Sequence, residues 1–180
     1  MYKRIAGLRK EVLNSLEGLN DDKNLMLLDS IDNFFECETY KKYEFVLNFC
    51  KKNGFNRIFD IGCAYGLQSE VFLGTKVDYV GVDEWKCLEF WNEKQFKYIV
   101  GHYPFKVNTN DNDLAVSSLC LGWNCYLHEG EKTLIEQCEA LQRDFKQCLL
   151  YIPKDKIECI GRYFEKVEMF DNGFVFFSNK

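Results

Sequence analysis

The feature that most restricts the fold of this chain is a short apolar run that leads into a turn of small residues. Arg57-Ile58-Phe59-Asp60-Ile61 is followed at once by Gly62-Cys63-Ala64-Tyr65-Gly66. Small residues at 62, 64 and 66 permit a tight turn and let the backbone approach a ligand closely. After Gly66 the period changes, and Leu67 to Phe72 is typical of a helix start. This order predicts a buried strand, a glycine turn and a helix, which together form one βα unit.

Short apolar runs alternate with helical patterns through the rest of the chain. The predicted strands are Val77–Val82, Lys97–Val100, Leu114–Leu119 and Cys148–Ile152, and helical spacing is found at Leu88–Phe96, Leu134–Phe145 and, less regularly, 154–161. Strands that alternate with helices favour a mostly parallel sheet with both faces covered. Near the end, Lys166–Phe170 and Phe174–Phe177 flank Asn172-Gly173, which predicts a β-hairpin and therefore an antiparallel strand.

The first fifty residues have no strand pattern and carry helical periodicity instead. Three apolar sets recur at three- and four-residue steps, and the third ends at Lys51-Lys52-Asn53-Gly54, a good helix stop. The sequence shows no repeat, low-complexity tract or linker. We therefore predict a single domain over 1–180, with an N-terminal helical cap at 1–54 and an α/β core at 55–180.

Two acidic residues stand at the predicted strand ends. Asp60 precedes the first glycine by two positions, and its carboxylate is expected at the mouth of the strand, where it attracts a ligand's ammonium group. Asp83 ends the next strand. In a βαβ unit that position overlooks a ribose. The helix start after Gly66 offers free N–H groups and a positive dipole end to a carboxylate. This combination matches an adenosine that carries a zwitterionic amino acid.

Two motifs of this sequence are similar to those of a known family. DIGCAYG followed by VGVD resembles motifs I and II of the class I S-adenosylmethionine-dependent methyltransferases, and the resemblance covers roughly 55–178. It implies a Rossmann-like three-layer sandwich with a mostly parallel seven-stranded sheet and a C-terminal antiparallel hairpin. It also implies S-adenosyl-L-methionine as the cofactor and direct methyl transfer to a small-molecule or protein acceptor.

The resemblance assigns roles to individual positions of this sequence. The turn residues imply contacts with the methionine end of the cofactor, Asp83 holds the ribose, and Trp85 packs near the adenine. The full set of implied cofactor-binding residues is Asp60, Gly62, Cys63, Ala64, Gly66, Asp83, Glu84, Trp85, His102 and Ser118. His128 is a candidate for a general base, because the pKa of a histidine lies near working pH, and the alternative is that it is a solvated loop histidine.

The sequence departs from the family pattern in three places. Ala64 replaces the usual middle glycine, and Gly101-His102-Tyr103 stands where an acidic residue often contacts adenine. The residues after the fourth strand, Ser117-Ser118-Leu119-Cys120, lack the Asn/Asp-Pro-Pro-aromatic signature of amino-group methylases. The short insertions, the missing acidic residue after the third strand and the unassigned base leave open a non-catalytic module that binds S-adenosylmethionine or a protein partner. A nicotinamide or flavin site fits less well, because it expects Gly-x-Gly-x-x-Gly.

Charge and cysteine content argue against several other classes of function. The net charge is −5 and no long cluster of Lys or Arg occurs, which disfavours nucleic acid as a partner. The nine cysteines include no Cys-x-x-Cys pair and the chain has only two histidines, so we expect reduced thiols and no metal site. No secretory leader or membrane-spanning apolar run is recognised. We therefore expect a cytoplasmic protein without a membrane association.

Overall fold

The computed structural model describes residues 2–16, 22–83, 96–101, 103–104, 106–118 and 131–179. The helical elements are α1 Lys3–Leu16, α2 Asp22–Glu36, α3 Thr39–Asn53, the short 3-10 helix η1 Leu67–Phe72, α5 Glu131–Asp144 and α6 Lys154–Gly161. The strands are β1 Arg57–Ile61, β2 Asp78–Asp83, β3 Lys97–Val100, β4 Asp113–Ser118, β5 Gln147–Tyr151, β6 Lys166–Met169 and β7 Phe174–Ser178.

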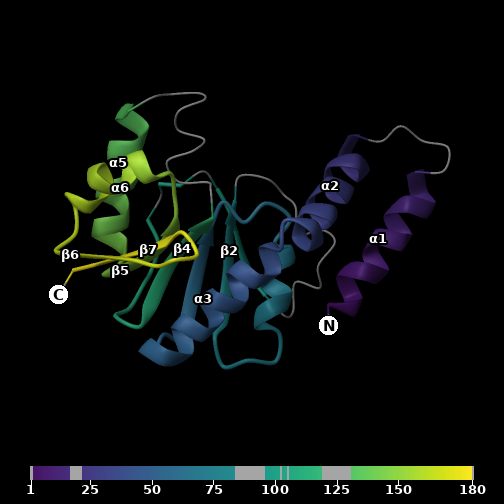
Figure 1. Ribbon diagram of the computed structural model, residues 1–180, viewed down its shortest axis with the longest axis horizontal. Coiled ribbons are helices and arrows are strands. Elements are labelled where there is room, and N and C mark those ends of the chain that lie inside the picture. Colours follow the sequence, from purple (N-terminus) through teal and green to yellow (C-terminus); the bar gives the residue numbers. More distant parts are fainter. Residues whose placement is uncertain are drawn as a thin grey trace.

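All seven strands form one sheet in the order β3-β2-β1-β4-β5-β7-β6 (Figure 1). β1 pairs in parallel with both β2 and β4, and β3 and β5 extend the parallel part on either side. β7 runs antiparallel to both β5 and β6. The predicted seven-stranded, mostly parallel sheet with a C-terminal antiparallel hairpin is therefore confirmed.

Helices cover both faces of the sheet, which makes three layers. Side chains alternate between the faces along each strand. Ile58 of β1 and Leu114 of β4 belong to a core that includes α3 and η1. Phe59 of β1 and Ala115 of β4 belong to a second core on the other face, with α5 and α6. The strands are apolar on both sides because each side is buried, as expected for parallel sheets.

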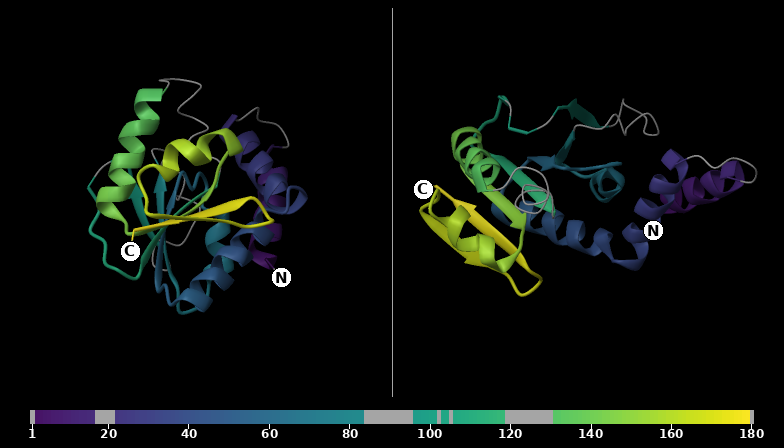
Figure 2. Two further views of the ribbon diagram at one scale, coloured as in Figure 1. Left: turned by 60° about the vertical axis from the view of Figure 1, so that its left-hand side comes forward. Right: turned by 90° about the horizontal axis from the view of Figure 1, so that it is seen from above.

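The N-terminal region divides into a helix on the sheet and a helical hairpin. α3 packs against the sheet and ends at Gly54, whose φ of 78° is the left-handed conformation that glycine favours after a helix. α1 and α2 lie side by side at the end of the molecule opposite to α5, α6 and the β6–β7 hairpin (Figures 1 and 2). Arg9 of α1 and Asp32 of α2 form a 2.6 Å ion pair across this hairpin. The division into a cap at 1–54 and a core at 55–180 stays a prediction.

Two helical expectations have different outcomes. The segment after the glycine turn, Leu67–Phe72, forms a 3-10 helix of six residues rather than the start of an α-helix. The helix expected over Leu88–Phe96 lies, apart from Phe96, outside the described residues. The predicted Asn172-Gly173 turn forms, and there the positive φ belongs to Gly173, at 87°.

Candidate functional site

The strand order reverses direction between β1 and β4. From β1 the chain proceeds outward to β2 and β3, and then returns to the other side of β1 to form β4 and β5. The loops at the carboxyl ends of β1 and β4 therefore lead away from each other. In open α/β sheets this switch point is where ligands bind. The predicted site residues Gly62, Asp83 and Ser118 all lie at this edge, because each ends or follows one of the parallel strands.

The turn after β1 takes a conformation that small residues favour. Gly62 and Gly66 have φ values of 77° and 65°, and Ala64 between them has a φ of 46°. A left-handed conformation strains an alanine but not a glycine. The turn is fixed by hydrogen bonds from Gly62 N to Val82 O at 2.8 Å and from Gly66 N to Cys63 O at 2.8 Å. Ala64 is exposed at its tip.

The carboxylate of Asp83 lies against this turn. The backbone N–H of Ala64 donates a 2.8 Å hydrogen bond to Asp83 Oδ2. The backbone of Asp83 is held separately, since its carbonyl accepts a 2.9 Å bond from Gly101 N. Asp83 is partly exposed. The structure thus brings together the turn and the acid that the sequence places on two different strands.

Asp60 is placed differently from the sequence expectation, because its side chain is inside the protein. It is 0% exposed, and its carboxylate accepts three hydrogen bonds. Tyr43 Oη of α3 donates to Oδ1 at 2.8 Å, and Tyr79 Oη of β2 donates to Oδ2 at 2.5 Å. Gln68 Nε2 of η1 donates to Oδ2 at 2.7 Å and also to Cys63 O at 2.9 Å. Asp60 therefore connects α3, β2 and η1 beneath the turn instead of standing at the mouth of the strand.

Burial dominates the electrostatics of this cluster. It raises the pKa of Asp60 to about 6, and the nearby charge of Asp83 acts in the same direction, whereas the hydrogen bonds from Tyr79, Gln68 and Tyr43 lower it. Burial also raises the pKa of both tyrosines well above the usual value, so they remain hydroxyl donors. The carboxylate of Asp60 therefore has hydrogen-bond donors, but these donors are neutral and do not balance its negative charge.

Strand alternation is the sequence signal that could have revealed this cluster. Asp60 has the same parity along β1 as Ile58, and in the β1–β2 register Ile58 is opposite Tyr79. Alternation therefore points Asp60 and Tyr79 to the same buried face, where α3 supplies Tyr43. A buried carboxylate requires donors, and the tyrosines and Gln68 meet that need. They look like ordinary core or helix residues when each is considered alone.

Cys63 and Ser118 complete the described part of the predicted set. Cys63 is 1% exposed, and a Cβ added at Gly81 would lie 2.9 Å from its Sγ. Ser118 is partly exposed at the end of β4. The neighbouring Ser117 is buried and donates a 2.9 Å hydrogen bond to Ile61 O, which ties the end of β4 to that of β1. Cys63 thus packs on the buried side of the turn, whereas Ser118 lies at the partly exposed end of β4.

Four predicted residues, Glu84, Trp85, His102 and His128, lie outside the described residues. Within the described ranges, no group of three His, Cys, Asp or Glu side chains is arranged to hold a metal ion. The cysteines there, at 37, 50, 63, 138, 148 and 159, form no disulfide with one another. Among the helices that the structure describes, none combines the length and apolar character that crossing a bilayer requires.

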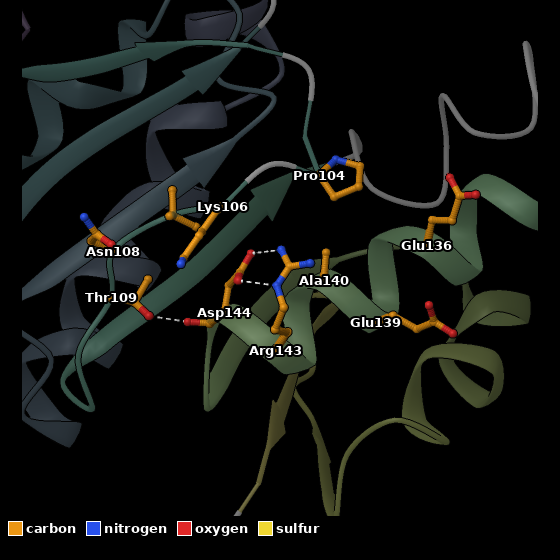
Figure 3. Close-up of a pocket in the computed structure, with 10 residues that line it drawn as sticks. Pro104, Lys106, Asn108, Thr109, Glu136, Glu139, Ala140, Arg143 and Asp144 are labelled. Atoms are coloured by element: carbon orange, nitrogen blue, oxygen red, sulfur yellow. Dashed lines mark hydrogen bonds and ion pairs between the residues drawn. The ribbon is translucent and has the colours of Figure 1, made fainter.

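A separate pocket of about 930 Å³ lies between the connection from β3 to β4 and helix α5 (Figure 3). Its wall carries charged side chains of both signs, including Lys106, Glu136 and Glu139. Arg143 and Asp144 on α5 are paired with each other through two hydrogen bonds of 2.7 and 2.6 Å. Of the predicted cofactor residues that the structure describes, none is among the residues lining this pocket.

Comparison with known proteins finds similarity only at the level of structure. No protein-family model matches the sequence, and no curated protein matches it. The bifunctional kinase-methyltransferase WbdD has a TM-score of 0.58 and 16% identity over 81% of this chain and 39% of its own. This chain spans only 39–41% of the length of the WbdD structures.

Two further structures match over most of this chain. Magnesium protoporphyrin IX methyltransferase (ChlM) from Synechocystis PCC 6803, solved with bound SAM, has a TM-score of 0.59 and 12% identity over 79% of this chain and 80% of its own. The plantazolicin methyltransferase BpumL, in complex with a pentazolic desmethylPZN analogue and SAH, has a TM-score of 0.53 and 20% identity over 88% of this chain and 65% of its own. At such identities the likeness shows the fold, and this chain has the fold of class I methyltransferases.

Proposed function

We propose that this protein binds S-adenosyl-L-methionine at the turn of residues 62–66 and transfers its methyl group directly to a small-molecule or protein acceptor. The observation that carries the proposal is the 2.8 Å hydrogen bond between Ala64 N and Asp83 Oδ2. It joins a turn of small residues to a partly exposed acid at the switch point of the sheet. The methyltransferase fold and the SAM and SAH bound to ChlM and BpumL support the same cofactor.

The residues present fit the chemistry of this cofactor. Its ribose presents two hydroxyl donors, and Asp83 is a partly exposed residue whose carboxylate can accept hydrogen bonds. Its amino-acid part and sulfonium leave the ligand with a net positive charge, and the site holds two acids, Asp60 and Asp83. Gly62 has no side-chain carbon and Ala64 has only a methyl group, so the backbone of the turn is accessible. We therefore assign Asp83 to the ribose and the turn to the methionine end.

When bound, S-adenosylmethionine supplies a methyl group on a sulfonium, which is an activated leaving group. The chain's own contribution is to orient the ligand and exclude water. Asp83 and the turn fix one end of the ligand through hydrogen bonds. An acceptor that must lose a proton also needs a base, and His128 stays the predicted candidate. The cytoplasmic location likewise stays a prediction.

Calorimetric titration with S-adenosylmethionine and S-adenosylhomocysteine tests the site. Asp83→Asn keeps an oxygen for Ala64 N but removes the charge, so we expect affinity to fall by about 10- to 100-fold. Asp83→Ala should weaken binding at least as much. Asp78→Asn is the matched control, because Asp78 is an exposed acid at the other end of the same strand. Equal affinities in Asp83→Asn and Asp78→Asn, or no binding by the unmodified protein, would contradict the assignment.

Transfer of a labelled methyl group then separates an enzyme from a binding module. The protein is incubated with labelled S-adenosylmethionine and either a metabolite extract or a protein extract. We expect label to appear in an acceptor from one of the two, and to be lost in Asp83→Ala. Tight cofactor binding without label in either extract would favour the alternative, a non-catalytic module with this fold.

A further inference from the structure

Asp60 is a buried acid whose hydrogen-bond donors in the described residues are all neutral groups. The hydrogen bonds that reach its carboxylate within the described residues come from Tyr43, Tyr79 and Gln68, and none comes from Lys, Arg or His. The charge that acts on Asp60 is that of Asp83 on β2, and Cys63 in the turn acts on the two tyrosines, and neither neighbour is cationic. The ionised form of Asp60 thus lacks a positive partner in the described part of the protein, and a positive ligand above the turn would supply one.

Gln68 links this carboxylate to the proposed ligand turn. Its Nε2 donates one hydrogen bond to Asp60 Oδ2 and a second to Cys63 O, at 2.7 and 2.9 Å. The carbonyl of Cys63 also accepts the 2.8 Å bond from Gly66 N that closes the turn. Asp60 is therefore one side chain away from the backbone that would face the ligand. Its carboxylate is buried in the protein, where electrostatic interactions are stronger than in water.

We propose that Asp60 is a specificity-determining residue, whose buried charge lets the site prefer a sulfonium ligand to the neutral thioether that remains after methyl transfer. The proposal rests on the function proposed above. S-Adenosylmethionine and S-adenosylhomocysteine share their ribose, adenine and amino acid, so the hydrogen bonds that Asp83 and the turn make to these groups are the same for both ligands. They differ in the methyl group and in the positive charge at sulfur, to which an ionised carboxylate responds and a protonated one does not.

The protonation of Asp60 makes this proposal testable. Burial places the pKa of Asp60 at about 6, so its charge changes within a range where proteins are readily studied. A cation bound nearby favours the ionised form, and binding should therefore release a proton at low pH. The preference for S-adenosylmethionine over S-adenosylhomocysteine should rise with pH through this range and then level off.

The test measures both dissociation constants by calorimetry between pH 5 and pH 8. In the unmodified protein we expect their ratio to change by on the order of tenfold. In Asp60→Asn the ratio should be constant and close to the low-pH value. Asp78→Asn, which alters the exposed acid at the start of β2, should retain the full change. A constant ratio in the unmodified protein, or the same change in Asp60→Asn, would overturn the proposal.

A second variant covers the case in which Asp60→Asn fails to fold. Tyr79→Phe keeps the carboxylate and removes the 2.5 Å hydrogen bond that stabilises its ionised form. The midpoint of the pH-dependent ratio should move to higher pH, and an unmoved midpoint would contradict the role of Asp60. If neither ligand binds the unmodified protein at any pH, the proposed function itself fails. If both bind with a pH-independent ratio, only the specificity role of Asp60 fails.

Discussion

The backbone N–H of Ala64 donates a 2.8 Å hydrogen bond to the carboxylate of Asp83, so two segments separated by a strand meet at one point. Ala64 contributes the exposed tip of the turn after β1, and Asp83 the last residue of β2. The contact depends on parallel pairing of β1 with β2 in a register that places Ile61 beside Val82. The geometry of the proposed ligand site therefore depends on the stability of the β1–β2 pairing.

Gly81→Ala should destabilise the protein and disturb the turn. A Cβ at Gly81 would lie 2.9 Å from Cys63 Sγ and 3.0 Å from Cδ2 of Tyr98, which is too close for either contact to persist. Overpacking of this kind costs about 1–3 kcal/mol, and we expect that loss in urea unfolding. Weaker binding of S-adenosylmethionine should accompany it. Unchanged stability would show that Cys63 and Tyr98 can move aside.

Gly7→Ala is the matched substitution without a clash. Gly7 lies in α1, and no atom lies within 4 Å of the place where its Cβ would be. Alanine in a helix interior is favoured over glycine by about 0.5–1 kcal/mol, so the free energy of unfolding should rise by that amount. Urea unfolding followed by far-UV circular dichroism measures both variants. A fall in stability for Gly7→Ala would count against the open environment of this position in α1.

Asp60 should make the free energy of unfolding depend on pH. In the unfolded chain an aspartate titrates near pH ~3.9. Folding raises the pKa of Asp60 to about 6, so the native protein binds more protons between these values. Stability should fall by up to about 3 kcal/mol as pH rises from about 4 to 6, and stay level above that. The difference between wild type and Asp60→Asn at pH 4.5 and 7.5 isolates this contribution, and an identical pH profile in both would refute it.

Loss of Asp113 should be more costly than loss of an exposed acid. Arg57 Nε donates to Asp113 Oδ1 at 2.9 Å, Arg57 Nη2 donates to Oδ2, and Asn110 N donates to Oδ2 at 2.7 Å. The side chain of Asp113 is 0% exposed, so Asp113→Ala leaves donors unsatisfied and should cost about 3–5 kcal/mol. Glu158→Ala breaks the exposed pair with Arg162 and should cost less than about 1 kcal/mol. Similar losses for the two variants in urea unfolding would contradict this difference.

The sequence predicts those parts of the fold that depend on local patterns. β1 and β3 have the bounds expected from their apolar runs, and β4 and β5 begin one residue earlier than expected. The meeting of the turn with Asp83 also follows, because neighbouring parallel strands end at the same edge. The burial of Asp60 was not predicted, because it depends on Tyr43 and Tyr79, which belong to other elements. Local spacing predicts where the strand ends but not which side chains close over it.

The packing of the turn against the N-terminal hairpin has a consequence for how this sequence can evolve. Tyr65 and Leu67, on either side of Gly66, share a core with Ile5 of α1 and Leu27 of α2. A mutation in that hairpin therefore alters the support of a turn that lies far along the chain from it. The two segments are expected to accumulate compensating substitutions together in descendants of this sequence, and a hairpin grafted from a distant homologue should require its own turn.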